Sequence, residues 1–224
     1  MNKTEKKKII LIYTGVAFLS VLILSAGIFL GKARRQHDRP VVEAAGKVEV
    51  VELIKLEEDI ELTRQDGAQV KLSDLHDKVW IAAQFYASCP MCAKRNAGAL
   101  IEVYRKFQDD PDFKVVCLSV DPAQDTNEHL QAMQEQMDVD GESWWFLKAE
   151  QEKIWDYMRN VMYFTDIRER TVPEEIAAKG RWSHDLGLQI YRGDALVGRW
   201  DEGRSREALF QEVESALKTL ESGE

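Results

Sequence analysis

The sequence has few of the residues that hold a disulfide-rich or zinc-stabilised fold together. It contains three cysteines and four histidines in 224 residues, too few cysteines for a disulfide-dense scaffold. Cys89 and Cys92 lie close together, but neither a second Cys-x-x-Cys nor a pair of histidines accompanies them. Because a structural zinc site needs four ligands, structural zinc is disfavoured.

Beyond the N-terminal segment, acidic residues outnumber basic ones. Residues 1–48 carry nine Lys or Arg against three Asp or Glu, a net charge of +6. The remaining residues carry 21 against 36, a net charge of −15. An acidic domain of this kind repels phosphate backbones, so we expect no nucleic-acid partner.

One long uncharged run stands near the N-terminus, the 22 residues 9–30, about 33 Å long as a helix at ~1.5 Å per residue. That length spans a bilayer, whereas a cleaved signal peptide has a shorter apolar core and a small-x-small site, which does not stand out here. No cysteine that a lipid could modify follows the run. We therefore expect a short basic cytoplasmic tail at 1–8, a transmembrane signal anchor at 9–30, a tether at 31–48 and one domain at 49–224.

The basic residues beside this run leave its orientation open. Four lysines precede the run and three basic residues closely follow it, so the positive-inside count is close to a tie. The eight preceding residues contain no Arg and are too few for a mitochondrial transit peptide. A single-pass protein of the bacterial inner membrane is the simpler interpretation.

Residues 49–224 alternate between strand and helix patterns. Asp66-Gly67 and Gly193-Asp194 each lie between alternating stretches and predict β-hairpin turns. Nearly continuous apolar runs at 79–86 and 113–120 predict buried central strands. The other expected elements are strands at 60–63, 70–72, 144–147, 188–191 and 195–200, and helices at 91–107, from 125, at 150–159 and from 205. This order predicts an α/β domain with a parallel sheet core flanked by helices.

Two details of this pattern are also predicted. Asp125 and Glu128 are expected to form a capping box for the helix that follows them, and Ser205 is expected to cap the last helix. Residues 160–183 contain Pro173, Gly180 and scattered charges, and we expect a long loop or an insertion there.

The strongest chemical motif is Cys89-Pro90-Met91-Cys92, at the turn from a predicted strand into a predicted helix. This placement is typical of thioredoxin-like folds. Unpaired N–H groups and the dipole at a helix N-terminus favour a thiolate on Cys89. Cys92, one turn later, can close a disulfide with Cys89 or share a metal with it. Cys117, inside an apolar strand, is expected to be a buried hydrophobe without a functional role.

Several motifs together resemble the SCO/SenC family, from about residue 61 to residue 200. The matching stretches are Leu62-Thr63, Gln65-Asp66-Gly67, Leu72-Ser73-Asp74-Leu75, Val79-Trp80, Phe85-Tyr86-Ala87-Ser88-Cys89-Pro90, Cys92, Leu118-Ser119-Val120-Asp121-Pro122, Asp125-Thr126 and Trp145-Phe146-Leu147. Members of that family are thioredoxin-like domains tethered by one N-terminal helix. The resemblance implies a thioredoxin-like fold with a mixed sheet, and a domain on the periplasmic side of the membrane.

The resemblance also implies a metal and a partner. The family binds copper through two cysteines and one histidine, and assists assembly of the binuclear copper centre in cytochrome c oxidase subunit II. The copper ligands would be Cys89, Cys92 and His184 here, a set in which thiolates hold Cu(I) and the imidazole permits Cu(II). The family usually has three residues between its cysteines, whereas this sequence has only Pro90 and Met91.

Two functions therefore stay open. In the first, Cys89, Cys92 and His184 bind copper and deliver it to the oxidase subunit or another copper or thiol client. In the second, the chain is a thiol-disulfide oxidoreductase that keeps a partner's cysteines reduced, with Cys89 as nucleophile and Cys92 as resolving thiol. A peroxidase is less favoured, because no acid or base near the cysteines is identifiable from the sequence.

Overall fold

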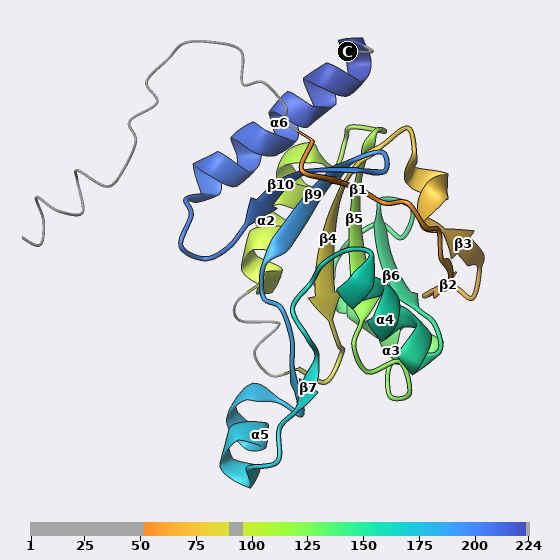
Figure 1. Ribbon diagram of the computed structural model, residues 1–224, viewed down its shortest axis with the longest axis vertical. Helices are drawn as coiled ribbons and strands as arrows, with labels where there is room; N and C mark the ends of the chain where they lie inside the picture. The colour runs from red at the N-terminus through yellow and green to blue at the C-terminus, as the bar shows by residue number, and fades with distance from the viewer. Residues whose placement is uncertain (1–51, 90–95, 223–224) are drawn as a thin grey trace, which may run out of the picture. The chain divides into compact units, whose positions relative to one another are not determined.

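The computed structural model describes residues 52–89 and 96–222 (Figure 1). The predicted tail, anchor and tether lie outside the described residues, and so does Cys92. Among the helices of the described part, none has both the length and the apolar character needed to cross a membrane.

A mixed sheet of eight strands forms the centre of the domain, in the order β1-β10-β9-β4-β5-β6-β2-β3. Only β4, β5 and β6 run parallel to one another, and antiparallel strands continue the sheet on both sides. The strands are β1 (Ile54–Lys55), β2 (Glu61–Arg64), β3 (Gln69–Lys71), β4 (Val79–Phe85), β5 (Phe113–Ser119), β6 (Trp144–Lys148), β9 (Leu188–Arg192) and β10 (Ala195–Trp200). The predicted parallel core is thus confirmed for the three central strands.

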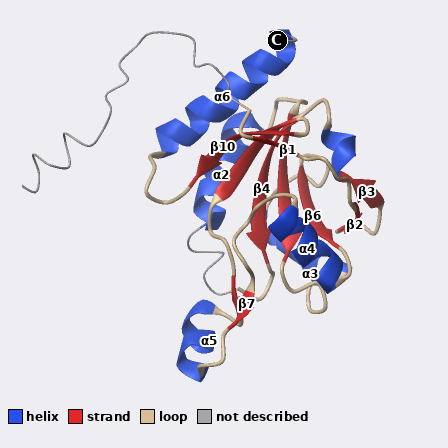
Figure 2. Ribbon diagram, in the orientation of Figure 1, coloured by secondary structure: helices blue, strands red, loops and turns tan. Residues whose placement is uncertain are grey.

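Helices cover both faces of this sheet (Figure 2). Because side chains alternate along a strand, β4 sends Ile81 and Ala83 into one apolar cluster and Trp80 and Ala82 into the other. The first cluster packs under α2 (Asn96–Phe107), α3 (Asn127–Met137) and α6 (Arg206–Ser222). The second packs under α4 (Gln151–Asn160), and a short 3-10 helix, η1 (Leu72–Leu75), joins β3 to β4.

Residues 160–183 contain more structure than the predicted loop. Strands β7 (Arg168–Glu169) and β8 (Trp182–Ser183) pair antiparallel, and α5 (Pro173–Lys179) lies between them. Figure 1 shows this arm extending beyond the sheet. The Arg170 guanidinium donates to the carbonyl oxygens of Gly180 and Trp182, so one cation ties the two ends of the arm together. Short strands and a seven-residue helix are too brief to give a periodic sequence pattern.

The predicted cap of α3 was wrong by one residue. Thr126 is the N-cap, and its hydroxyl accepts a hydrogen bond from the backbone N–H of His129 at 3.3 Å. The Asp125 carboxylate is buried and accepts hydrogen bonds from other elements instead. The cap at Ser205 is confirmed, because its hydroxyl accepts from the Ala208 N–H at 3.2 Å.

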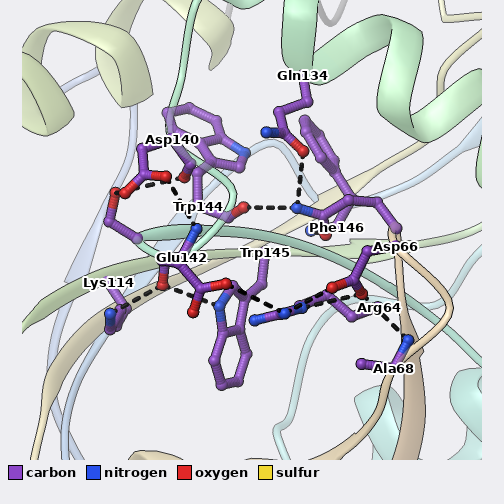
Figure 3. A network of polar contacts seen from close by, with 12 residues as sticks. Arg64, Asp66, Ala68, Lys114, Gln134, Asp140, Glu142, Trp144, Trp145 and Phe146 are labelled. Atoms are coloured by element: carbon purple, nitrogen blue, oxygen red, sulfur yellow. Dashed lines mark hydrogen bonds and ion pairs between the residues drawn. The ribbon is translucent and has the colours of Figure 1, made fainter.

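A polar network fixes the first hairpin on β6 (Figure 3). Gln65 follows β2, and its side chain accepts from the Phe146 N–H at 2.9 Å and donates to the Trp144 carbonyl at 3.0 Å. Beside it, the Arg64 guanidinium lies 5.5 Å from the centre of the Trp145 ring. Its hydrogen bond to Asp66 lowers the pKa of that carboxyl to about 2. Adjacent Trp144 and Trp145 belong to the apolar clusters on opposite faces of the sheet.

Candidate functional site

Cys89 lies in a tight turn just after β4. Its backbone N–H donates to the Tyr86 carbonyl at 3.1 Å, and the residue is only 7% exposed. The turn is also held from the side, because the Ala87 N–H donates to the Asp125 carboxylate at 2.9 Å. The predicted position of Cys89 at the end of a central strand is confirmed.

The side chain of Asp125, which supports this turn, is buried. It is 1% exposed, and its second carboxylate oxygen accepts from the Ser119 hydroxyl at 2.5 Å. Burial raises the pKa of Asp125 above its ordinary value, although these two hydrogen bonds act in the opposite direction. The Asp125 carboxylate therefore connects the loop that carries Cys89 to the end of β5.

His184 lies in the segment that joins β8 to β9. Its Nδ1 atom is 2.7 Å from the carbonyl oxygen of Asp185. Because a carbonyl oxygen only accepts hydrogen bonds, Nδ1 carries a hydrogen, and in the neutral ring the lone pair is then on Nε2. Histidines that bind a metal through one ring nitrogen commonly donate the N–H of the second ring nitrogen to a carbonyl or carboxylate oxygen.

Asp185 fixes the shape of this segment. Its backbone N–H donates to Oε1 of Gln84 at 2.7 Å, and its carboxylate accepts from the N–H groups of Gly187 at 2.8 Å and Thr165 at 3.1 Å. The segment around His184 is therefore bonded to β4 on one side and to the chain after α4 on the other.

Tyr86 connects the two predicted site residues. Its carbonyl accepts from the Cys89 N–H, and its ring meets the His184 ring edge to face, with 5.6 Å between the ring centres. Positions 86 and 184 are far apart in the sequence, so only the fold places the histidine beside the cysteine turn. Within the described ranges, no group of three or more His, Cys, Asp or Glu side chains is placed to hold a metal ion. The complete predicted set includes Cys92, which lies outside those ranges.

A cavity of about 250 Å³ adjoins the Cys89 turn. Cys89, Cys117, Met133 and Met137 are among the residues that line it, together with aliphatic and aromatic side chains. Cys117 is buried, as predicted, and burial raises the pKa of its thiol to about 12. It therefore stays protonated at neutral pH and is a poor nucleophile.

Sequence reasoning missed Gln84 and Asp185 as parts of this site. Gln84 did give a signal, because it is the one polar residue in the apolar run 79–86. Asp185 gave none, since an acidic residue in a loop is most often solvated.

Comparison with known families and structures identifies relatives over most of the domain. The family model described as SCO1/SenC matches residues 52–218. The structure is similar to that of a SCO1/SenC family lipoprotein from Bacillus anthracis, with a TM-score of 0.64, 19% identity and coverage of 74% of this chain and 97% of the other. Arabidopsis thaliana ScoI with copper bound gives a TM-score of 0.59 and 18% identity, with coverage of 73% and 99%.

A third similar structure is BsSco, described as having a disulfide switch and as a member of the Sco family of cytochrome c oxidase assembly proteins. Its TM-score is 0.58 at 19% identity, with coverage of 75% of this chain and 96% of the other. At these identities the structural matches establish the fold, and they confirm the predicted thioredoxin-like α/β domain. The chain matches no curated protein.

Proposed function

Because the chain belongs to the SCO1/SenC family, we propose that it binds copper and assists assembly of the copper centre of cytochrome c oxidase. The observation that carries this proposal is the position of His184. Its ring packs against Tyr86 of the Cys89 turn, and its Nδ1 hydrogen bonds to a backbone carbonyl. That tautomer offers the Nε2 lone pair to a metal.

The copper ion is the cargo of this site, and its ligands are Cys89, Cys92 and His184. Two thiolates suit Cu(I), and the added imidazole nitrogen lets the same site accept Cu(II). Cys89 lies in a turn held by hydrogen bonds to the Tyr86 carbonyl and the Asp125 carboxylate, which limits the rearrangement needed to bind the ion. The copper-bound ScoI of Arabidopsis thaliana, which shares the fold, supports the choice of metal.

The proposed client is cytochrome c oxidase subunit II or another protein that receives copper through thiols. The domain acts on the periplasmic side of the bacterial inner membrane, with residues 9–30 as its anchor. The description of the Bacillus anthracis relative as a lipoprotein supports attachment to a membrane.

Copper titration of the reduced full-length chain tests this proposal. We expect one copper per chain for both Cu(I) and Cu(II), with a thiolate-to-copper absorption band in the Cu(II) form. Cys89→Ser should abolish the band, and His184→Ala should weaken Cu(II) binding while Cu(I) is retained by the thiolates.

His129→Ala is a matched control for this titration. His129 is an exposed histidine whose Nδ1 also lies near a backbone carbonyl, that of Gln124 at 2.8 Å. The control variant should bind copper as the wild type does. A reduced chain that retains no copper after buffer exchange would overturn the proposal.

A second function is favoured by the spacing of the cysteines. Two residues between cysteines is the spacing of thioredoxin-like oxidoreductases, and Cys89 lies in the turn that follows β4. The Cys89 thiolate would attack a client disulfide, form a mixed disulfide and release one client thiolate. Cys92 would then attack Cys89, which releases the second client thiol and leaves a Cys89–Cys92 disulfide.

The reduction potential of the cysteine pair separates the two functions. A potential close to that of thioredoxin, about −270 mV, favours a reductase. Thiol exchange that survives His184→Ala while copper binding changes would assign the histidine to copper alone.

A further inference from the structure

We propose that Gln84 is a positioning residue that sets the orientation of the copper-binding imidazole of His184. This inference rests on the proposed function and adds to it a residue outside the ligand set. Gln84 is part of β4, the strand that leads to Cys89. It therefore connects the cysteine side of the site to the histidine side.

Gln84 is a polar residue in a strand whose seven residues are all buried. It is 2% exposed, and its Oε1 atom accepts the Asp185 N–H at 2.7 Å. Its Nε2 atom has no hydrogen-bond partner in the part of the chain that the structure describes. A buried amide left half satisfied costs free energy, so fold stability does not explain a glutamine here.

The hydrogen bond from Asp185 to Gln84 restrains the imidazole through the backbone of a single residue, Asp185. The Asp185 N–H belongs to the peptide that joins it to His184, and the Asp185 carbonyl, which accepts from His184 Nδ1 at 2.7 Å, belongs to the next peptide; the two are connected through the Asp185 Cα. Displacement of the Asp185 backbone away from Gln84 would disturb both contacts. Gln84 therefore keeps the ring in the tautomer and orientation that direct Nε2 to a ligand.

A second buried glutamine shows the contrast with a purely structural role. Gln189 in β9 pairs in register with Ala82, which places it on the same face of the sheet as Gln84. Its amide nitrogen donates to the Met162 carbonyl at 3.0 Å, and its Oε1 accepts from the Tyr191 hydroxyl at 2.7 Å. Both ends of Gln189 are satisfied, so Gln189→Met is a matched control for Gln84→Met.

Copper titration and NMR of the full-length chain test the role of Gln84. We expect Gln84→Met to weaken Cu(II) binding about tenfold, the scale of one hydrogen bond, and to leave Cu(I) binding nearly unchanged. In EPR spectra of the Cu(II) form of Gln84→Met, the hyperfine coupling to the ligand nitrogen should decrease. Gln84→Glu keeps an acceptor oxygen for the Asp185 N–H and should restore part of the Cu(II) affinity.

Two NMR measurements on the metal-free chain test the orientation of the His184 ring independently of copper binding. In Gln84→Met, the ¹⁵N shifts of the His184 ring should lose the pattern of a single Nδ1–H tautomer, and the Asp185 amide should exchange about tenfold faster. Gln189→Met should keep the wild-type copper spectra and the His184 shifts, although it lowers the unfolding midpoint.

The outcomes separate this inference from the proposed function. Equal Cu(II) binding by the wild type and His184→Ala would overturn the proposed ligand set, and the metal-free shifts would still decide whether Gln84 orients the ring. If His184→Ala weakens Cu(II) binding but Gln84→Met matches the wild type in copper spectra and ring shifts, the role of Gln84 is overturned alone.

Discussion

Replacing Asp125 tests how the turn that carries Cys89 is supported. The carboxylate accepts the Ala87 N–H and the Ser119 hydroxyl, and it is almost completely buried. Its pKa is raised above the ordinary value of 3.8, which means that desolvation outweighs both hydrogen bonds. The charge of this carboxylate is therefore a cost to the fold, while its oxygen atoms are useful acceptors.

The pH dependence follows from the direction of this shift. A carboxyl whose pKa is higher in the folded state binds its proton more tightly there, so protonation stabilises the fold. This contribution is complete below the unfolded pKa of about 3.8 and is lost as the pH rises through the folded pKa. Asparagine is neutral and has no such dependence; its one oxygen can accept from the Ala87 N–H, and its NH2 group can donate to the Ser119 hydroxyl oxygen. We therefore expect Asp125→Asn to be as stable as the wild type or more stable at pH 7, and the difference to shrink toward pH 4.

Removal of the whole side chain should have the opposite effect. Asp125→Ala leaves the Ala87 N–H and the Ser119 hydroxyl without their acceptor. At about 1–3 kcal/mol for each of the two unsatisfied buried groups, the loss is about 2–6 kcal/mol. For a domain of this size, at about 2–4 °C per kcal/mol, that corresponds to a decrease in Tm of about 4–24 °C.

Urea unfolding followed by tryptophan fluorescence measures these differences at pH 4, 5, 6 and 7. Asp109→Asn, at an exposed position, controls for the loss of one negative charge. Equal destabilisation by Asp125→Asn and Asp125→Ala at pH 7 would show that the charge of Asp125 is not a cost to the fold. The same holds if the difference between Asp125→Asn and the wild type widened as the pH fell.

Three further outcomes are expected. Gln65→Met should cost about 2–4 kcal/mol in urea unfolding, because it leaves buried β6 backbone groups unpaired, whereas the exposed Gln69→Ala should stay within about 0.5 kcal/mol. In a variant whose only thiol is Cys117, native protein at pH 8 should resist iodoacetamide and unfolded protein should react, since the thiol is buried with a pKa of about 12. Gly193→Ala should lower Tm in a thermal melt, because φ is +57° and a Cβ would lie 2.6 Å from the His76 carbonyl oxygen; an unchanged Tm would contradict this.

The central strands and the closing helix were predictable because each is long and strongly patterned. The apolar runs at 79–86 and 113–120 became β4 and β5, and the Gly193-Asp194 turn joins β9 to β10 as expected. The arm between β7 and β8 was not predictable, since its strands have two residues each and depend on the Arg170 hydrogen bonds for their ends. Local pattern carries little information about elements of that length.

The capping box at Asp125 shows how tertiary contacts override a local rule. The spacing of Asp125 and Glu128 fits a capping box, and Thr126 is an equally good cap one residue later. The Ala87 N–H and the Ser119 hydroxyl decide between them, because both need the Asp125 carboxylate as an acceptor. Neither of these two hydrogen bonds can be predicted from the residues around position 125, because the Ala87 N–H and the Ser119 hydroxyl come from other elements.

The position of His184 depends on residues outside the cysteine motif. Gln84 and Thr165 hold Asp185, and Tyr86 packs against the imidazole ring. The number of residues between the cysteines enters none of these contacts. The sequence predicts a helix start at the cysteine pair, where a spacing shorter by one residue would turn the second sulfur by about 100° around the helix; the contacts of His184 named above do not include that segment. A change in the metal preference of this chain should accordingly be sought in its thiolates.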